Sequence, residues 1–378
     1  NDERAVIENA TVLIKGNRIE SIARGTAVPE DYTEIDLAGK TIMPGIIDAH
    51  AHGPYAGDDI IPQQNWNLLA HLALGVTTVH NPSSSAKSAF AAAEYARTDR
   101  ILGPRIFSTG EIVYGAKSTS WAPIDNLDDA LAHVRRLAAQ GAISVKNYNQ
   151  PRREQRQQVI EAARQEGLIS VAEGGSLYQL DMSMIADGIT GIEHNVPTLK
   201  MYDDVHQFWR QSGAGYTPTL VVTYGGLTSE DYFYQNTEVW KHPILSNFVP
   251  PSQLQARSVR RVTAPEEDYR DDDSAAAAKI LMDAGIMVNI GAHGQREGLA
   301  SHWEMWSFAR GGFSPMEALA TATINPARHL GMDKDIGSLE AGKLADLVIV
   351  DANPLDDIRN TDRISHVMIN GRLYRAGD

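Results

Sequence analysis

The apolar and polar positions in the middle of the chain follow two different periods. In residues 127–140 and 153–166 the apolar positions recur every three or four residues, which is the pattern of an amphipathic helix. Each of these segments is followed by a glycine and then by a short β-branched run, at 143–145 and 168–171. Because glycine commonly follows a helix end, this order predicts repeated units of helix and strand.

Further short apolar runs have the length and composition of buried strands. They are the run that ends at Asp48 and residues 75–79, 105–108, 191–193, 215–222 and 286–290. Together with the two runs above they make eight, the number that a closed (β/α)8 barrel needs. We therefore expect an α/β fold built on a TIM-like barrel.

The interval 225–275 is too long for an ordinary connection between a strand and a helix of such a barrel. It carries the aromatic residues Tyr232, Phe233, Tyr234 and Trp240 and ends in an acidic run at 271–273. Long barrel loops often cover active sites, so these aromatics would suit an apolar substrate. A packing surface for another domain is an equal alternative. The acidic run is typical of a solvated face that leads into a helix.

Composition narrows the class of protein. With 378 residues and 43% hydrophobic content, the chain can bury a large core and suits one barrel with a small companion domain. A formal charge of −14 argues against nucleic acid as the main partner. No apolar run reaches the roughly 18 residues of a membrane span. Zero cysteines mean that any metal must be bound through nitrogen and oxygen.

Two histidines, His50 and His52, follow the first predicted barrel strand. Side chains two residues apart on a strand point the same way, so both imidazoles would leave the strand end together. Imidazole suits zinc, iron, manganese or nickel, and the pair is therefore a candidate half of a metal site. The plainer alternative is a pair of hydrogen-bonded histidines at a strand end.

Polar residues also follow other predicted strands, at the end where barrel enzymes carry their active sites. Polar residues at strand ends are often only loop residues or helix caps, so convergence of compatible chemistry has to decide. The candidates are His50, His52, Lys146, Glu173, His194 and His293. Nitrogen and oxygen ligands from so many strands predict a metal centre.

Two motifs near opposite ends of the chain carry a family resemblance. The sequence PGIIDAHAH at 44–52 resembles the first metal motif of the amidohydrolase superfamily, in its imidazolonepropionase- and prolidase-like branch. The sequence GSLEAGKLADLVIV at 337–350 resembles the segment where that family leaves its barrel for a small β-sandwich. The similarity extends through almost everything except about 225–275. It implies a sandwich from 1–45 and 337–378, and a barrel at 46–336 with an insertion at about 225–275.

The first residues suggest a longer parent chain. Residues 5–19 join the family pattern midway through its sandwich, without the usual first strand and Asp-Gly turn. The barrel resembles amidohydrolase domains that follow a TolB-like β-propeller in longer periplasmic proteins. We therefore expect an upstream β-propeller as a partner, and a periplasmic or secreted bacterial location. The missing cysteines fit export without establishing it.

The resemblance assigns roles to the residues at the strand ends. Lys146 falls where relatives carry a lysine carboxylated by carbon dioxide, and a carbamate can bridge two metal ions. The alternative is a lysine that pairs with Glu173 or another nearby acid. His194 matches the ligand position after strand six, with a role in supporting a ligand as its alternative. The implied cofactor is one or two divalent ions, with zinc favoured and manganese, iron or nickel as alternatives.

Two positions depart from the family pattern. Glu173 stands where most relatives have histidine after strand five, and His293 stands where they have the aspartate after strand eight. Glu173 would replace an imidazole ligand by an oxygen ligand. In relatives the aspartate binds metal and takes a proton from the attacking water, so His293 is predicted to be the catalytic base. A metal ligand, a donor to substrate and a structural histidine remain alternatives for it.

These assignments predict a metal-dependent hydrolase that attacks an amide bond, in a peptide-like or cyclic substrate, with metal-bound hydroxide. Bound metal lowers the pKa of water from about 15.7 towards about 7. Tyr148, Tyr224 and His302 are candidate contacts to the small-molecule or peptide-like substrate. The same hydroxide would also serve an esterase, lactonase or carbamate hydrolase. The lost aspartate keeps open a catalytically weak barrel that binds a ligand or a partner.

Overall fold

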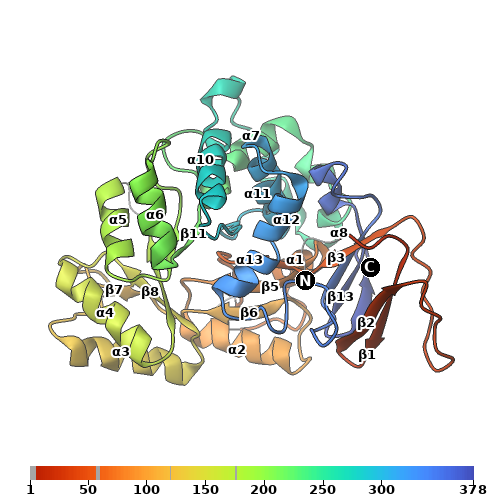
Figure 1. Ribbon diagram of the computed structural model, residues 1–378, viewed down its shortest axis with the longest axis horizontal. Helices are drawn as coiled ribbons and strands as arrows, with labels where there is room; N and C mark the ends of the chain where they lie inside the picture. The colour runs from red at the N-terminus through yellow and green to blue at the C-terminus, as the bar shows by residue number, and fades with distance from the viewer. Residues whose placement is uncertain (1–5, 57–59, 120, 175–176) are drawn as a thin grey trace.

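Parallel strands form the centre of the molecule in the computed structural model, which describes residues 6–56, 60–119, 121–174 and 177–378 (Figure 1). One sheet has the order β4-β5-β6 and a second has the order β11-β10-β9-β8-β7, and all neighbours in both are parallel. The strands are β4 (Ile46–Asp48), β5 (Val76–Asn81), β6 (Arg105–Ser108), β7 (Val113–Tyr114), β8 (Ser144–Tyr148), β9 (Ile169–Glu173), β10 (Gly191–Glu193) and β11 (Gly215–Thr217).

The predicted closed barrel is only partly seen. Residues 286–290 are joined to β11 by a parallel bridge between Tyr216 and Val288, but they do not form a regular strand. A few backbone hydrogen bonds lie at the junctions of the two sheets, from Ala49 to Ile290 at 3.2 Å, from His293 to His50 at 2.6 Å and from Ile143 to Ser108 at 3.4 Å. Among the described residues the strands therefore form two sheets and not one closed sheet. The α/β class is confirmed.

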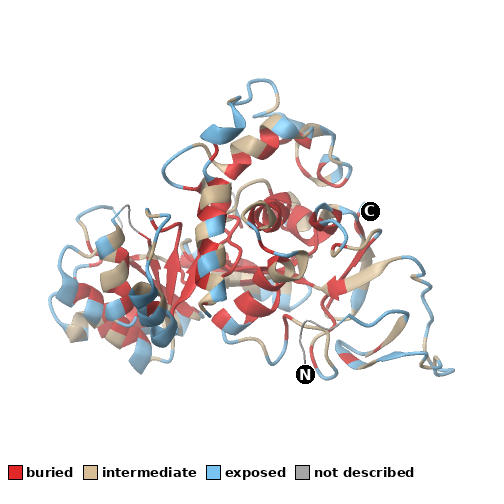
Figure 2. Ribbon diagram, turned by 45° about the horizontal axis from the view of Figure 1, so that its top comes forward, coloured by how far each residue is buried: buried red, intermediate tan, exposed pale blue. Residues whose placement is uncertain are grey.

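Helices cover the outside of these sheets. Figure 2 shows the strands as buried and the outward faces of the surrounding helices as exposed. The longer helices are α1 (Trp66–Ala73), α2 (Ala86–Arg97), α3 (Leu127–Gln140), α4 (Arg153–Gln165), α5 (Tyr178–Ala186), α6 (Asp203–Ser212), α7 (Ser229–Asn236), α10 (Asp271–Asp283) and α11 (Leu299–Arg310). Shorter ones are α8 (Leu245–Phe248), α9 (Pro251–Leu254), α12 (Pro315–Thr321), α13 (Ile324–His329), η1 (Leu220–Val222), η2 (Val239–Lys241), η3 (Glu266–Asp268) and η4 (Ile358–Asp362).

Helix α3 shows why the spacing of apolar residues predicted this helix correctly. The Asn126 side chain accepts a hydrogen bond from the backbone of Asp129 at 3.1 Å, which satisfies a donor that the first turn leaves free. The helix ends at Gly141, whose φ of 111° favours glycine. Its apolar stripe, which includes Val134 and Leu137, is buried. Helix α4 likewise confirms its prediction and ends one residue earlier than expected.

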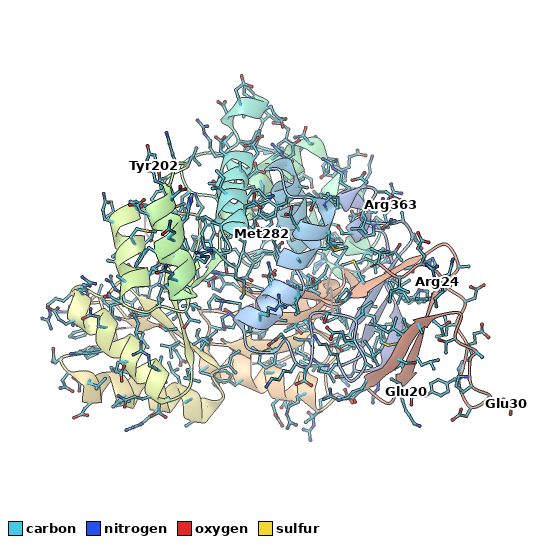
Figure 3. The ribbon with its side chains drawn as sticks, viewed as in Figure 1. Glu20, Arg24, Glu30, Tyr202, Met282 and Arg363 are labelled. Carbon is cyan, nitrogen blue, oxygen red and sulfur yellow. The ribbon has the colours of Figure 1, made fainter. Side chains whose placement is uncertain are left out.

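Both ends of the chain contribute to small antiparallel sheets. One pairs β1 (Ala10–Lys15) with β2 (Arg18–Arg24), and the other has the order β14-β13-β12-β3. Its strands are β3 (Thr41–Pro44), β12 (Leu347–Val350), β13 (Ile364–Ile369) and β14 (Arg372–Arg375). A shared apolar cluster contains Ile19 from β2 and Leu347 from β12. Charged side chains of β2, among them Glu20 and Arg24, lie at the outer edge of the molecule (Figure 3). The sandwich and the domain boundaries stay predictions.

The long segment 225–275 corrects two expectations. Phe233 stacks on Trp303 of α11 with ring centroids 5.4 Å apart, and Tyr234 meets the same ring edge-on. Both aromatic side chains are buried, so the prediction that they face an apolar substrate is wrong. The acidic run is not a fully solvated face either, because Asp271 begins α10 and is buried. Every helix among the described residues is too short or too polar to cross a bilayer.

Candidate metal centre

Three histidines meet at the carboxyl ends of the parallel strands. One ring nitrogen from each of His50, His52 and His293 lies within 4.8 Å of the others. The Nε2 atoms of His50 and His52 are 3.1 Å apart. Two nitrogens bound to one tetrahedral zinc ion lie about 3.3 Å apart, given zinc–nitrogen distances of about 2.0–2.1 Å. The donor set therefore fits a divalent ion.

Asp48 holds the two segments that carry these histidines together. Its buried carboxylate accepts hydrogen bonds from the backbone amides of His50 and Ala292, each at 3.1 Å, and from the Ser301 hydroxyl at 2.8 Å. The first amide follows β4, and the second directly precedes His293. One carboxylate thus fixes both sides of the cluster.

The backbone around the cluster is held in unusual conformations. His293 and His194 have φ values of 58° and 70°, in the left-handed region that non-glycine residues rarely adopt. Such residues cost on the order of 1–3 kcal/mol and are concentrated at functional sites. Gly294 has a φ of 79°, and a Cβ there would collide with the backbone of His52. Only glycine therefore allows the segment after His293 to pack on the His50–His52 segment.

Polar partners orient the first two imidazoles. The Nδ1 atom of His50 lies 2.5 Å from the carboxylate of Glu193, and both side chains are buried. The Nδ1 atom of His52 lies 2.9 Å from the Oδ1 atom of Asn81. Hydrogen bonds of this kind fix the ring and leave the opposite nitrogen to a metal. In both rings the Nε2 atom is therefore the candidate ligand.

Burial keeps the cluster neutral. It lowers the pKa of His50 well below its usual value, with a further contribution from the charge of Lys146, and it also lowers the pKa of His52. Burial and the nearby His52 and His194 lower the pKa of His293 to about 3. Neutral imidazoles are the form that binds metal. Burial thus leaves the His293 ring neutral, and its assignment as the base stays a prediction.

Lys146 and Glu173 meet each other at the same mouth. The Nζ atom of Lys146 lies 2.9 Å from one carboxylate oxygen of Glu173, and the Nε2 atom of His194 lies 3.0 Å from the other. Burial alone would raise the pKa of Glu173, but the hydrogen bond from His194 and the charge of Lys146 hold it well below its usual value. The structure thus shows the ion pair that the sequence left as an alternative to a carboxylated lysine.

His194 faces the cluster from β10. Its Nδ1 atom lies 2.7 Å from the hydroxyl of Thr219, and its ring centroid is 5.0 Å from those of His50 and His293. The structure therefore brings together all the residues that were predicted to bind metal. The roles of Lys146, Glu173 and His194 as ligands stay predictions.

The three residues that were predicted to contact the substrate lie in different environments. Tyr224 lies at the mouth, stacks on His194 at 5.1 Å and donates a hydrogen bond to Glu173 at 3.2 Å. Tyr148 stacks on Tyr114 at 5.1 Å, and the charge of Glu173 contributes, after burial, to its raised pKa. His302 does not reach the site. Its buried Nε2 atom binds the backbone carbonyl of Leu74 at 2.9 Å, so its proposed substrate contact is wrong.

Sequence reasoning missed the residues that support the cluster. Glu193 is the clearest case, because burial raises its pKa to about 8 and its partner His50 lies on another strand. A charged residue at the end of a short buried strand was the available signal. Asn81 and Thr219 carried no comparable signal, since single amide and hydroxyl side chains are common at strand ends.

Parallel strands that end in a histidine cluster define an α/β protein with a candidate metal centre at the strand ends. The chain belongs to the amidohydrolase family, which it matches over residues 41–374. It is 24% identical to the imidazolonepropionase of Deinococcus radiodurans over 376 residues, covering 94% of this chain and 89% of the relative. The resemblance to that family and to its imidazolonepropionase-like members is thereby confirmed.

Solved structures agree on the fold. A Xaa-Pro dipeptidase with bound methionine in the active site has a TM-score of 0.73 at 22% identity, covering 97% of this chain and 95% of that chain. Phenylurea hydrolase B has a TM-score of 0.73 at 21% identity, covering 97% and 92%. Prolidase-like neighbours were expected from the sequence, and they are present. The link to propeller-containing proteins stays a prediction.

Proposed function

We propose that this protein is a metal-dependent hydrolase that cleaves an amide carbon–nitrogen bond in a peptide-like or cyclic substrate. The observation that carries the proposal is the cluster of His50, His52 and His293, whose nitrogens converge while burial keeps the rings neutral. Membership of the amidohydrolase family supports the reaction class. An imidazolonepropionase among the relatives, and a dipeptidase among the similar structures, support the substrate class.

The three histidines would hold one divalent ion, with zinc favoured for an all-nitrogen set and manganese, iron or nickel as alternatives. A bound divalent ion supplies Lewis acidity, which makes water acidic near neutral pH and polarises a carbonyl group. The protein's own contribution is orientation. Glu193 and Asn81 fix the rings of His50 and His52, and Asp48 fixes the backbone from which two of the ligands project.

Proton transfer falls to one of two residues. A ligand nitrogen cannot also accept a proton, so with His293 on the ion we assign the acceptor role to Glu173, an ionised carboxylate at the mouth. Lys146, His194 and Tyr224 hold its two oxygens in place. In the arrangement predicted from sequence, Glu173 is a ligand and His293 moves the proton. The two arrangements predict different results when the His293 imidazole is removed. Metal binding is weakened if His293 is a ligand, and it is retained if His293 only moves the proton.

Whether a second metal ion can bind depends on whether Lys146 is an ammonium group or a carbamate. As an ammonium group 2.9 Å from Glu173, Lys146 would repel a second cation. Carboxylation would replace this charge by a carbamate, which repels Glu173 and frees both side chains to bind metal. We keep the carboxylated, two-ion form as a proposal, together with the sandwich, the upstream β-propeller and the periplasmic or secreted location.

Substrate contacts are proposed for Tyr148 and Tyr224. Tyr224 already donates to a carboxylate oxygen, and the same hydroxyl can donate to the oxyanion that forms when a carbonyl is attacked. An ester, lactone or carbamate would offer the same carbonyl.

Metal analysis of the purified protein, followed by a panel of dipeptides, cyclic amides, lactones, esters and carbamates, tests the proposal. We expect bound metal and hydrolysis that is greatest for an amide. Metal-dependent hydrolysis confined to oxygen esters would refute the amide assignment. A protein that binds metal but hydrolyses none of the panel would favour the ligand-binding barrel.

A further inference from the structure

Strands β10 and β11 carry a polar face inside the molecule. Gly191 pairs with Gly215, and Glu193 pairs with Thr217. Residues two apart on a strand point to the same side, so the two glycines share this face with the side chains of Glu193 and Thr217. One carboxyl oxygen of Glu193, Oε2, also contacts His50. The face therefore adjoins the histidine cluster.

His329, the last residue of α13, lies over the two glycines. A Cβ at Gly191 would be 2.7 Å from the Cε1 atom of His329, and a Cβ at Gly215 would be 2.6 Å from its Nδ1 atom. Larger residues at 191 or 215 would therefore displace the imidazole. The ring is buried and lies on the same side of the strands as the Glu193 carboxylate.

Besides the Thr217 hydroxyl, four buried polar atoms on this face have no hydrogen-bond partner within the part of the chain that the structure describes. They are the Nε2 atom of His329, the Nδ2 and Oδ1 atoms of Asn289, and the Oε1 atom of Glu193. The exposed fractions are 7% for His329 and 0% for the other two residues. The Thr217 hydroxyl lies beside Glu193 without reaching hydrogen-bond geometry. Buried polar atoms are normally paired, so a partner of another kind is required.

The spacing of these atoms suits a bridging molecule. The Nε2 atom of His329 and the Oε1 atom of Glu193 lie 3.0 and 3.6 Å from the same point, the Cβ position of Gly191. The Nδ2 atom of Asn289 lies 3.5 Å from the Cβ position of Gly215. The Nε2 atom of His329 and the Oε1 atom of Glu193 therefore lie near one another, and a single water, which can donate two hydrogen bonds and accept two, is a partner that can serve both. A cation would leave the N–H groups of Asn289 unsatisfied.

We propose that His329, Asn289 and Glu193 form a binding site for ordered water, and that this water fixes the carboxylate that orients His50. His329 is then a positioning residue, which acts on His50 through water and Glu193. The inference rests on the proposed function in so far as His50 is a metal ligand. Loss of the water site leaves the Glu193 carboxyl group held through one oxygen only, at His50, and supporting residues of this kind change metal affinity by about 10- to 100-fold.

Variants of the full chain test this role through the dissociation constant for zinc, measured by competition with a chromophoric chelator. His329→Phe and Asn289→Leu remove the polar atoms, and two variants are used because each alters the packing at a different position. We expect each to raise the Kd by about tenfold, and His329→Gln, which restores a polar nitrogen, to stay within about threefold of the unchanged protein. A Kd unchanged in both variants overturns the proposal.

Asn325→Leu is the matched control, because Asn325 is a buried residue of the same helix whose side chain already donates to the carbonyl of Val288 at 2.9 Å. It should lower stability, yet keep the Kd within about threefold. A high-resolution crystal structure provides the second measurement. Ordered water between His329 and Glu193 supports the proposal, and a dry gap overturns it. A protein that binds no zinc but shows this water contradicts the proposed function while leaving the water site intact.

Discussion

The Nδ1 atom of His50 and the Oε2 atom of Glu193 lie 2.5 Å apart, although 143 residues separate them in the sequence. This contact crosses from β4 to β10 and turns the Nε2 atom of His50 towards His52 and His293. It connects the fold with the chemistry, because the parallel strands have to assemble before the imidazole is oriented.

The stability of the metal-free protein should depend on pH through its buried neutral histidines. The folded pKa of His293 is about 3, below the value of about 6.5 in an unfolded chain. The unfolded state therefore binds more protons, and stability present above pH 6.5 is lost as the pH falls towards 3. For His293 alone the loss is on the order of 5 kcal/mol, of which about 3 kcal/mol falls between pH 7 and 4. Chemical denaturation between pH 7 and 4 measures it, and His293→Asn should show a smaller slope. Equal slopes for the two proteins would contradict the environment described.

His293→Asn separates the two roles of this residue. With His293 on the ion, the substitution should lower both the metal content and kcat, because one of three nitrogen ligands is lost. If His293 is the base, metal content stays near that of the unchanged protein and kcat alone falls. Elemental analysis and steady-state kinetics on the same preparation distinguish these outcomes. A variant with full metal and unchanged kcat and kcat/KM would exclude both roles.

Glu173→Gln should leave Lys146 as a buried charge without its acidic partner. Breaking a buried ion pair in this way costs about 3 kcal/mol or more. Because the pKa of Glu173 is depressed, its contribution is present above about pH 4 and decreases as the pH falls below that value, so the variant should differ less from the unchanged protein at pH 3 than at pH 7. Denaturation at pH 7 and at pH 3 measures both effects. Arg97→Gln, which removes an exposed pair with Glu94, is the control and should change stability by less than about 1 kcal/mol.

Gly294→Ala should disturb the histidine cluster by shifting the backbone next to His293. Its φ of 79° and the collision of a Cβ with His52 both oppose the substitution. We expect a loss of more than about 3 kcal/mol of stability, or a displaced His293 with weaker metal binding. Gly225→Ala is the matched control, because Gly225 also has a positive φ, 94°, but nothing lies within 4 Å of its Cβ position. Equal destabilisation by both variants would show that the contact with His52 has no role.

Much of the site was predictable because it depends on local rules. Alternation along a strand placed His50 and His52 together, and the barrel pattern placed His194 and His293 at the same end. The contact between Glu193 and His50 was not predictable, since it depends on how two strands approach through the core. Lys146 and Glu173 were identified, but their ion pair was only one of two alternatives.

The errors have a common physical cause. Phe233, Tyr234 and His302 were assigned to the substrate because of their chemistry and their place after a strand. Each lies on a helix whose inward face is set by tertiary packing, and each is buried in the structure. A loop position and a helix position look alike in a sequence when the connection is long. The (β/α) pattern likewise indicated the strands without showing whether they close into one sheet.

Metal stoichiometry of the unchanged protein and of the double variant His50→Ala/His52→Ala tests the central claim most directly. Both preparations are loaded with zinc, desalted and measured by elemental analysis, with circular dichroism to confirm that the variant is folded. The account predicts at least one zinc ion per chain in the unchanged protein and none in the folded variant. A folded double variant that retains the full metal complement would contradict the assignment of the histidine cluster as the metal centre.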